Sequence, residues 1–235
     1  MLPARQSPLH LHLLQTWVRW KLRRHFHSLE ALTYDGPDLT GKNWSYPTIL
    51  YGTHHSWWDT FFLLQFWRAL KQEPWVMMEA RNLARFPFFR KVGVFGVDLD
   101  DAKGRSESLL YALRLLKHAG DRRRVLLVYP QGRLVPYDGE WPPFQGGVAE
   151  LLRLVPAARA VPVSLHIRHG KYMLPEARFG FGKAFFGTRK PETPVLEEAL
   201  RSLDGCVRAS WNESAVEPTG RRFLLPPHPR LRGTT

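Results

Sequence analysis

Short apolar runs alternate along this chain with longer stretches whose apolar side chains recur at helical spacing. The apolar runs have the length of buried strands and lie at residues 48–50, 75–78, 92–99, 125–129 and 159–167. The helical stretches lie at residues 60–67, 105–119, 148–154 and 194–212. Strands alternating with helices in this way predict an α/β domain with a mixed, mostly parallel sheet flanked by helices.

The two ends of the chain differ in composition from this central part. We expect an N-terminal amphipathic helical segment at residues 1–33, the α/β domain at 34–216 and a basic tail rich in proline and arginine at 217–235. The tail is expected to be poorly ordered or to touch a membrane. Within the domain, residues 34–47 predict a connecting loop and residues 171–186 predict a pair of strands with a glycine-rich turn.

The N-terminal segment mixes apolar and basic residues between positions 9 and 29. Its apolar side chains form two neighbouring ridges at helical spacing, one of Leu13, Trp17 and Trp20 and one of Leu14, Val18 and Leu22. Two interpretations stay open for this helix. It lies in a membrane interface with its cations reaching toward headgroups, or it packs on its own domain.

The charge balance indicates an anionic partner. Lysine and arginine total 34 against 21 aspartate and glutamate residues, a formal net charge of +13. Nucleic acid, a phosphorylated ligand and an acidic membrane surface each suit this charge. The 9 tryptophans and 14 phenylalanines fit the headgroup layer of a bilayer as well as stacked bases. No apolar stretch is long enough for a transmembrane helix, and we expect no signal peptide.

Two smaller features refine this picture. Cys206 is the single cysteine, which excludes an intramolecular disulfide and fits a reducing compartment. Residues 86–89 read Phe-Pro-Phe-Phe and are flanked by four cations, Arg81, Arg85, Arg90 and Lys91. Core phenylalanines on a short helix would explain this segment, but we favour a patch that faces a membrane or an acyl chain.

The candidate chemistry begins directly after the run at residues 48–50. His54 and Asp59 lie between this strand and the next helix, a place where open α/β sheets carry their functional sites. Ser56 has the spacing of an N-cap with Asp59 three residues on, which would leave His54 in the turn and free to face Asp59. By itself this pattern is more often a capped helix start than an active site.

A second polar turn follows the run at residues 125–129. It reads Pro130-Gln131-Gly132-Arg133 and occupies the same position relative to its strand as the histidine turn. The order of these blocks resembles the glycerolipid acyltransferase family, which includes the 1-acylglycerol-3-phosphate acyltransferases. The resemblance covers roughly residues 45–167, and its most specific block is residues 53–59, similar to the family's Asn-His-x-Ser-x-x-Asp.

The resemblance implies an O-acyltransferase with His54 as general base and Asp59 as the carboxylate that orients it. It also implies that Gln131, Gly132, Arg133 and Arg81 bind the substrate. The acyl donor would be an acyl thioester, acyl-CoA or acyl-ACP, as a co-substrate, with no further cofactor and no metal. Expected partners are this donor (acyl carrier protein among the candidates), a lipid acceptor and an anionic membrane surface, but no nucleic acid. The protein would be peripheral or monotopic on the cytoplasmic face of the membrane.

Three departures from the family pattern bear on the acceptor. Gln131 replaces a glutamate, Arg133 comes one residue early, and Leu99 stands where an arginine is expected. The missing arginine would hold the acceptor's phosphate, a role that Arg81 or Arg105 would have to take over. The acceptor is accordingly a lysophospholipid or glycerolipid-like alcohol, or one without phosphate such as a glycolipid or glycosylated terpenoid.

Two other classes of protein compete with this hypothesis. A basic nucleic-acid-binding protein would explain the charge and the aromatic residues, but no helix-turn-helix, zinc or RNA-recognition signature is found. A metal hydrolase would use His54, His55 and Asp59, but the sequence lacks further clustered ligands. No role is assigned to His55 in the acyltransferase hypothesis.

Overall fold

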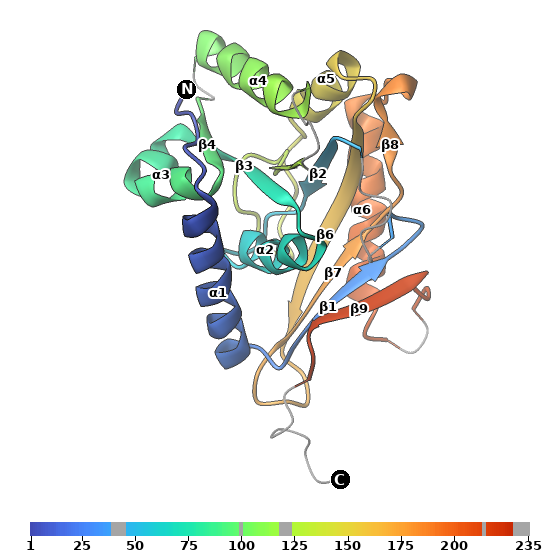
Figure 1. The fold of residues 1–235 in the computed structure, drawn as a ribbon. Helices are drawn as coiled ribbons and strands as arrows, with labels where there is room; N and C mark the ends of the chain where they lie inside the picture. The colour runs from blue at the N-terminus through green and yellow to red at the C-terminus, as the bar shows by residue number, and fades with distance from the viewer. Residues whose placement is uncertain (39–45, 99–100, 118–123, 213–214, 228–235) are drawn as a thin grey trace.

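The computed structural model describes residues 1–38, 46–98, 101–117, 124–212 and 215–227. Within these residues the chain forms a nine-stranded sheet with helices packed on it (Figure 1). The strand order is β4-β3-β5-β2-β6-β7-β1-β9, and β8 pairs with β6 beside this path. The predicted mixed α/β fold, with a helix at the N-terminus, is confirmed.

The strands are β1 (Ser28–Thr33), β2 (Thr48–Gly52), β3 (Glu73–Glu79), β4 (Val94–Val97), β5 (Arg124–Val128), β6 (Arg159–Arg168), β7 (Glu176–Phe181), β8 (Phe185–Phe186) and β9 (Gly220–Leu225). The α-helices are α1 (Pro8–His25), α2 (Asp59–Leu70), α3 (Ala80–Arg85), α4 (Ala102–Lys117), α5 (Gly147–Leu154) and α6 (Thr193–Ala209). Two short 3-10 helices are η1 (Pro87–Val92) and η2 (Gly187–Arg189).

The part of the sheet that carries the predicted site is parallel. Strands β4, β3, β5, β2 and β6 run in one direction, whereas β7 is antiparallel to β6 and β9 is antiparallel to β1. In the centre β2 lies beside β5, with Tyr51 opposite Val128. Because parallel neighbours end at the same edge of a sheet, the two polar turns singled out in the sequence meet there.

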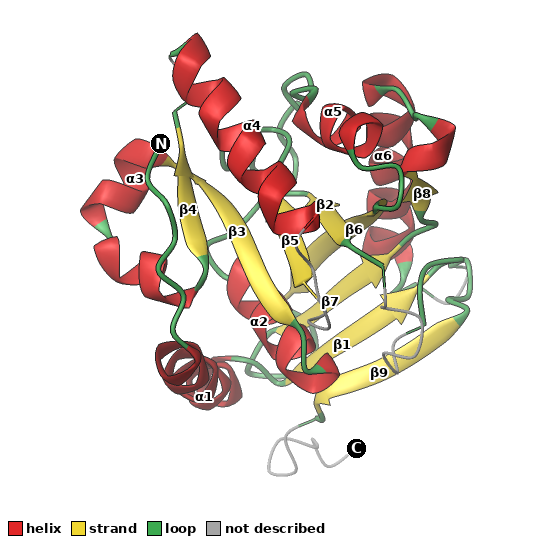
Figure 2. Cartoon of the chain, turned by 45° about the horizontal axis from the view of Figure 1, so that its top comes forward, coloured by secondary structure: helices red, strands yellow, loops and turns green. Residues whose placement is uncertain are grey.

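The sheet separates two apolar cores, since successive side chains of a strand point to opposite faces. In β2, Leu50 belongs to one core, whereas Ile49 and Tyr51 belong to the other. Helices α1, α2 and α3 close the first core, and α4, α5 and α6 close the second (Figure 2). Burial on both faces explains why the parallel strands read as continuous apolar runs in the sequence.

Helix α1 packs on its own domain through one of its two apolar ridges. Leu14, Val18 and Leu22 are buried in the first core. The neighbouring ridge of Leu13, Trp17 and Trp20 is left in contact with solvent, and these side chains are 57%, 50% and 49% exposed. The two interpretations of this helix are therefore compatible, because one ridge anchors it and the other is free for a further contact.

Four strands differ from their predictions, two of them near the ends of the chain. Residues 28–33 form a fully buried strand inside the segment expected to be helical, and Gly220–Leu225 forms an edge strand inside the tail expected to be poorly ordered. Strands β7 and β8 do not pair with each other, since both pair with β6. The sheet thus draws strands from both flanking segments of the chain.

Some predictions lie outside the described residues. These are the interior of the loop at 34–47, position 99 with its missing arginine, the end of the helix predicted up to residue 119, and the tail beyond residue 227. Among the described residues, no helix is both long and apolar enough to span a membrane.

Candidate active site

His54 lies in the irregular turn between the end of β2 and the start of α2. Its Nδ1 atom is 3.1 Å from Oδ2 of Asp59, the first residue of α2. The Asp59 side chain is only 2% exposed, whereas that of His54 is 24% exposed. With Nδ1 directed at a buried carboxylate, Nε2 is the ring nitrogen available to a substrate.

Asp59 also fixes the backbone of the turn. Its Oδ2 atom accepts the backbone N–H groups of His55 at 2.8 Å and Ser56 at 2.9 Å. The prediction that Ser56 caps the helix is wrong, because α2 begins at Asp59 and Trp58 is the residue before it. The Ser56 hydroxyl instead accepts the Trp58 N–H at 3.2 Å and closes the turn ahead of the helix.

The turn after β5 holds His54 from a second side. The Tyr129 ring stacks on the imidazole with 4.1 Å between centroids, and burial, with Asp59 nearby, raises the Tyr129 pKa so that the phenol stays neutral. Oε1 of the buried Gln131 accepts the His54 backbone N–H at 3.1 Å. The Val135 N–H donates to the His54 carbonyl at 2.7 Å. The turns after β2 and β5 therefore form one structural unit.

A pocket of about 720 Å³ opens beside this unit, and His54 is part of its wall. The wall is mainly apolar, and β3, β4, β5 and α4 contribute Val76, Met78, Val94, Val97, Leu109 and Val128 to it. Trp57, which is 58% exposed, lines the pocket as well. The imidazole thus faces a mainly hydrophobic space.

Of the four predicted substrate-binding residues, two line this pocket and two do not. Gly132 and Arg133 line it, together with Arg105. Gln131 is buried behind the histidine turn. Arg81 is not part of the wall; its guanidinium is 2.6 Å from Glu79, a residue that does line the pocket.

Gly132 has a backbone reason to be glycine. Its φ angle of 70° lies in the left-handed region. This conformation is energetically unfavourable for residues that have a Cβ atom. Its N–H donates to the Tyr129 carbonyl at 3.0 Å. The backbone N–H of Gly132 is therefore engaged in the turn.

Comparison with protein-family models matches residues 25–166, more than half of the 235-residue chain, to the family described as Acyltransferase. The chain belongs to the Acyltransferase family. The match contains His54, Asp59, the turn after β5 and most of the pocket wall. A search of curated proteins finds no match to the chain.

A solved structure shares the fold of this acyltransferase. It is the 1-acyl-sn-glycerophosphate (LPA) acyltransferase, PlsC, from Thermotoga maritima, with a TM-score of 0.57 and 12% sequence identity. The similarity covers 88% of this chain and 81% of that one. It therefore extends over the sheet as well as the helices that flank it.

One polar cluster beside the site was not predicted from the sequence. His55 and His166 converge on Asp204, and their ligand-type atoms lie within 4.8 Å of one another. The sequence contained part of the evidence for this cluster, because Ser164 and His166 are polar residues on one face of an otherwise apolar strand. Asp204 could not be assigned as their partner, since only the packing of α6 on β6 brings it there.

Proposed function

We propose that this protein is a membrane-associated O-acyltransferase that moves a fatty acyl group from an acyl thioester to a hydroxyl of a lysophospholipid or glycerolipid-like acceptor. The observation that carries the proposal is the His54–Asp59 pair, with His54 in the wall of a large, mainly apolar pocket. An acyl chain supplies the apolar surface that such a pocket would bury.

The chemistry follows from the orientation of His54. An alcohol is too weak an acid to attack a thioester unaided, so Nε2 of the neutral imidazole takes the hydroxyl proton as the oxygen–carbon bond forms. Asp59 on Nδ1 keeps the proton there and stabilises the imidazolium. The tetrahedral intermediate then expels the thiolate, which receives the proton from His54. The acceptor hydroxyl is the nucleophile, so no covalent enzyme intermediate forms.

The charged residues of the pocket bear on the acceptor's headgroup. Arg105 and Arg133 line the pocket and are suited to a phosphate. Glu79 lines it too and holds Arg81 through an ion pair. This carboxylate favours a second class of acceptor, a glycolipid-like alcohol without phosphate, because it accepts hydrogen bonds from hydroxyl groups and repels an anion.

An exposed aromatic surface connects the pocket with a membrane in this proposal. It consists of the outer ridge of α1 and the segment around η1, with Trp17, Trp20, Phe86 and Phe88 between 42% and 50% exposed. His10 contacts Phe88 and Trp57 contacts Phe86, at 6.2 Å and 6.0 Å between ring centroids. Because Trp57 also lines the pocket, a lipid would pass from the bilayer to His54 over one continuous aromatic surface.

The cations on this aromatic surface also suit contact with a membrane. Lys21 lies over the Trp17 and Trp20 rings at 5.7 Å and 5.3 Å, and Arg24 lies over Trp20 at 4.8 Å. Side chains that combine aromatic rings and cations suit the headgroup layer of an anionic membrane. We therefore place the protein at the membrane surface, where its lipid acceptor is found.

The direct test supplies the purified protein with a labelled acyl-CoA or acyl-ACP and a total lipid extract. The proposal predicts release of the thiol together with an acylated lipid whose label is in an ester. Mass spectrometry of the product identifies the acceptor and distinguishes a phospholipid from a glycolipid. Thiol release without a labelled lipid, at the same rate with and without the extract, would show a thioester hydrolase and contradict the proposal.

A further inference from the structure

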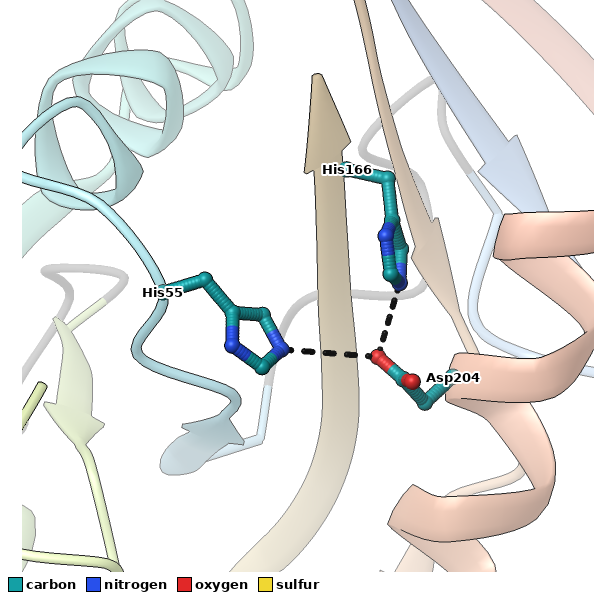
Figure 3. A group of neighbouring side chains, drawn as sticks. All are labelled: His55, His166 and Asp204. Carbon is teal, nitrogen blue, oxygen red and sulfur yellow. Dashed lines mark hydrogen bonds and ion pairs between the residues drawn. The ribbon is translucent and has the colours of Figure 1, made fainter. Parts of the chain in front are cut away.

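His55, next to the proposed general base, is not part of the pocket wall, and its imidazole is directed at Asp204 of α6, which His166 of β6 also contacts (Figure 3). Its side chain is fully buried, and its Nδ1 is 2.7 Å from the Val135 carbonyl oxygen. Its Nε2 atom is 3.7 Å from Oδ1 of Asp204 and has no hydrogen-bond partner among the described residues. This residue stands at the family's variable position, so the family motif assigns it no function.

The two neighbours of the His55 ring decide its protonation state. A carbonyl oxygen can only accept, so Nδ1 must carry a proton. Nε2 would then direct a lone pair at a carboxylate if the ring were neutral, which is repulsive in a buried site. A proton on Nε2 turns this repulsion into an ion pair. The geometry therefore favours the imidazolium form of His55.

Asp204 is held as an anion by its other contacts. Oδ1 accepts the Ser164 hydroxyl at 2.6 Å and His166 Nε2 at 2.8 Å, and Arg208 lies 3.4 Å from Oδ2. Burial alone would raise the pKa of Asp204, but the hydrogen bonds from His166 and Ser164 and the nearby His55 ring lower it well below its usual value. A buried carboxylate of this kind needs a cation beside it.

The remaining titratable groups around His55 include Tyr137, Asp59 and His166, whose ring centroid lies 5.8 Å from that of His55. The Tyr137 ring lies 4.6 Å away, and its pKa is raised by burial, so it stays neutral. Burial opposes a charge on His55, but Asp204, the Val135 carbonyl and Asp59 outweigh it, and the net effect raises the His55 pKa above 6.5. Of the neighbouring charged groups, Arg208 is on the far side of Asp204 and is largely exposed.

Two hydrogen-bonded links connect His55 with His54, the proposed general base. The His55 backbone N–H donates to Oδ2 of Asp59, the same oxygen that faces His54 Nδ1. Val135, whose carbonyl accepts His55 Nδ1, donates its own N–H to the His54 carbonyl. A displacement of the His55 ring would therefore move both the carboxylate and the backbone that orient His54.

We propose that His55, as an imidazolium paired with Asp204, is a positioning residue that holds the His54 turn between α6 and the loop after β5. The inference rests on the proposed function, since it assigns His55 to the same reaction. It makes acyl transfer require two opposite protonation states in adjacent residues, a neutral His54 and a charged His55. The pair with Asp204 is present at low pH and is lost as the pH rises through the raised pKa of His55.

The kinetic test uses His55→Gln, Asp204→Asn and their double variant, with Glu198→Gln as a control because Glu198 is exposed on the same helix. Each single variant should lower kcat about tenfold or more, since a misplacement of about 1 Å can cost about 100-fold. The double variant should be no slower than the slower single variant, because both residues act as one unit. The decline of kcat at alkaline pH should disappear in His55→Gln, whereas Glu198→Gln keeps the wild-type profile.

A second readout needs no activity and separates this inference from the proposed function. Nitrogen-15 NMR of histidine-labelled wild-type protein should show His55 doubly protonated at pH 6.5, and Asp204→Asn should lower its pKa. A neutral His55 at that pH, or a pKa unchanged in Asp204→Asn, overturns the inference even if acyl transfer is confirmed. Stoichiometric zinc in the purified protein, lost in His166→Ala, would also overturn it, because a metal would then occupy the place of the proton.

Discussion

The carboxylate of Asp59 and the amide of Gln131 orient His54 from opposite sides. Asp59 was predictable because it lies five residues from His54 and the intervening turn brings the two together. Gln131 was predicted as a substrate-binding residue in a turn, without its contact to the His54 backbone. Its contact with the His54 N–H depends on the pairing of β2 with β5, which joins residues 77 positions apart. Local spacing thus predicted the His54–Asp59 contact, and the support from Gln131 depends on tertiary packing.

The Gln131 contact predicts a contrast between two substitutions. Gln131→Met keeps the approximate size but leaves the partly buried His54 N–H without its acceptor, which should lower the free energy of unfolding by about 1 kcal/mol. It should also lower kcat, because the histidine turn loses one support. Gln131→Glu keeps an acceptor and restores the family's residue, so it should retain more activity. Urea unfolding and initial rates check both; equal rates in the two variants would contradict this role of Gln131.

At the scale of elements, the strands and helices of the central sheet were predictable because each is apolar on the faces it buries. Strands β1 and β9 were not. Strand β1 directly follows the amphipathic helix α1 and continues its apolar pattern, and β9 lies in a segment of prolines and arginines. Each becomes a strand by pairing with distant residues: β1 with Glu176–Phe181, and β9 with β1.

Substitutions on the two ridges of helix α1 should have different effects, one on stability and the other on lipid binding. Leu22→Ala removes a side chain that is 0% exposed in the core and should lower the free energy of unfolding by about 2–5 kcal/mol. Trp17→Ala removes a half-exposed ring, which should change stability by less than about 1 kcal/mol and reduce binding to lipid vesicles. Thermal unfolding and vesicle co-sedimentation check the pair. If Trp17→Ala binds vesicles as the wild type does, the outer ridge is not a membrane contact.

At the scale of the whole molecule, a net charge of +13 restricts the partners without naming one. The structure adds that Lys21 and Arg24 lie over exposed tryptophans on α1, the arrangement expected for a bilayer surface. Charge alone left nucleic acid and membrane equally possible. The placement of the exposed aromatic rings, which depends on the fold, supports the membrane proposal.

This charge predicts that binding to anionic vesicles depends on salt. Raising the ionic strength from about 0.1 M to about 1 M shortens the screening length from about 10 Å to about 3 Å. Binding to vesicles with anionic lipid should therefore weaken strongly over this range, while weaker binding to neutral vesicles should change little. Vesicle flotation measures both. An oligonucleotide bound more tightly than anionic vesicles at the same salt concentration would favour the nucleic-acid hypothesis instead.

In the proposed reaction, His54 takes the proton of the attacking hydroxyl. This step is tested most directly by comparing single-turnover acyl transfer in the wild type, His54→Ala and Asp59→Asn, with circular dichroism to verify that each variant is folded. His54→Ala should lower the rate by about 100-fold or more, the usual contribution of a general base. Asp59→Asn should cost less, because Asp59 orients the imidazole without transferring the proton. A folded His54→Ala variant that transfers acyl groups at the wild-type rate would contradict the account.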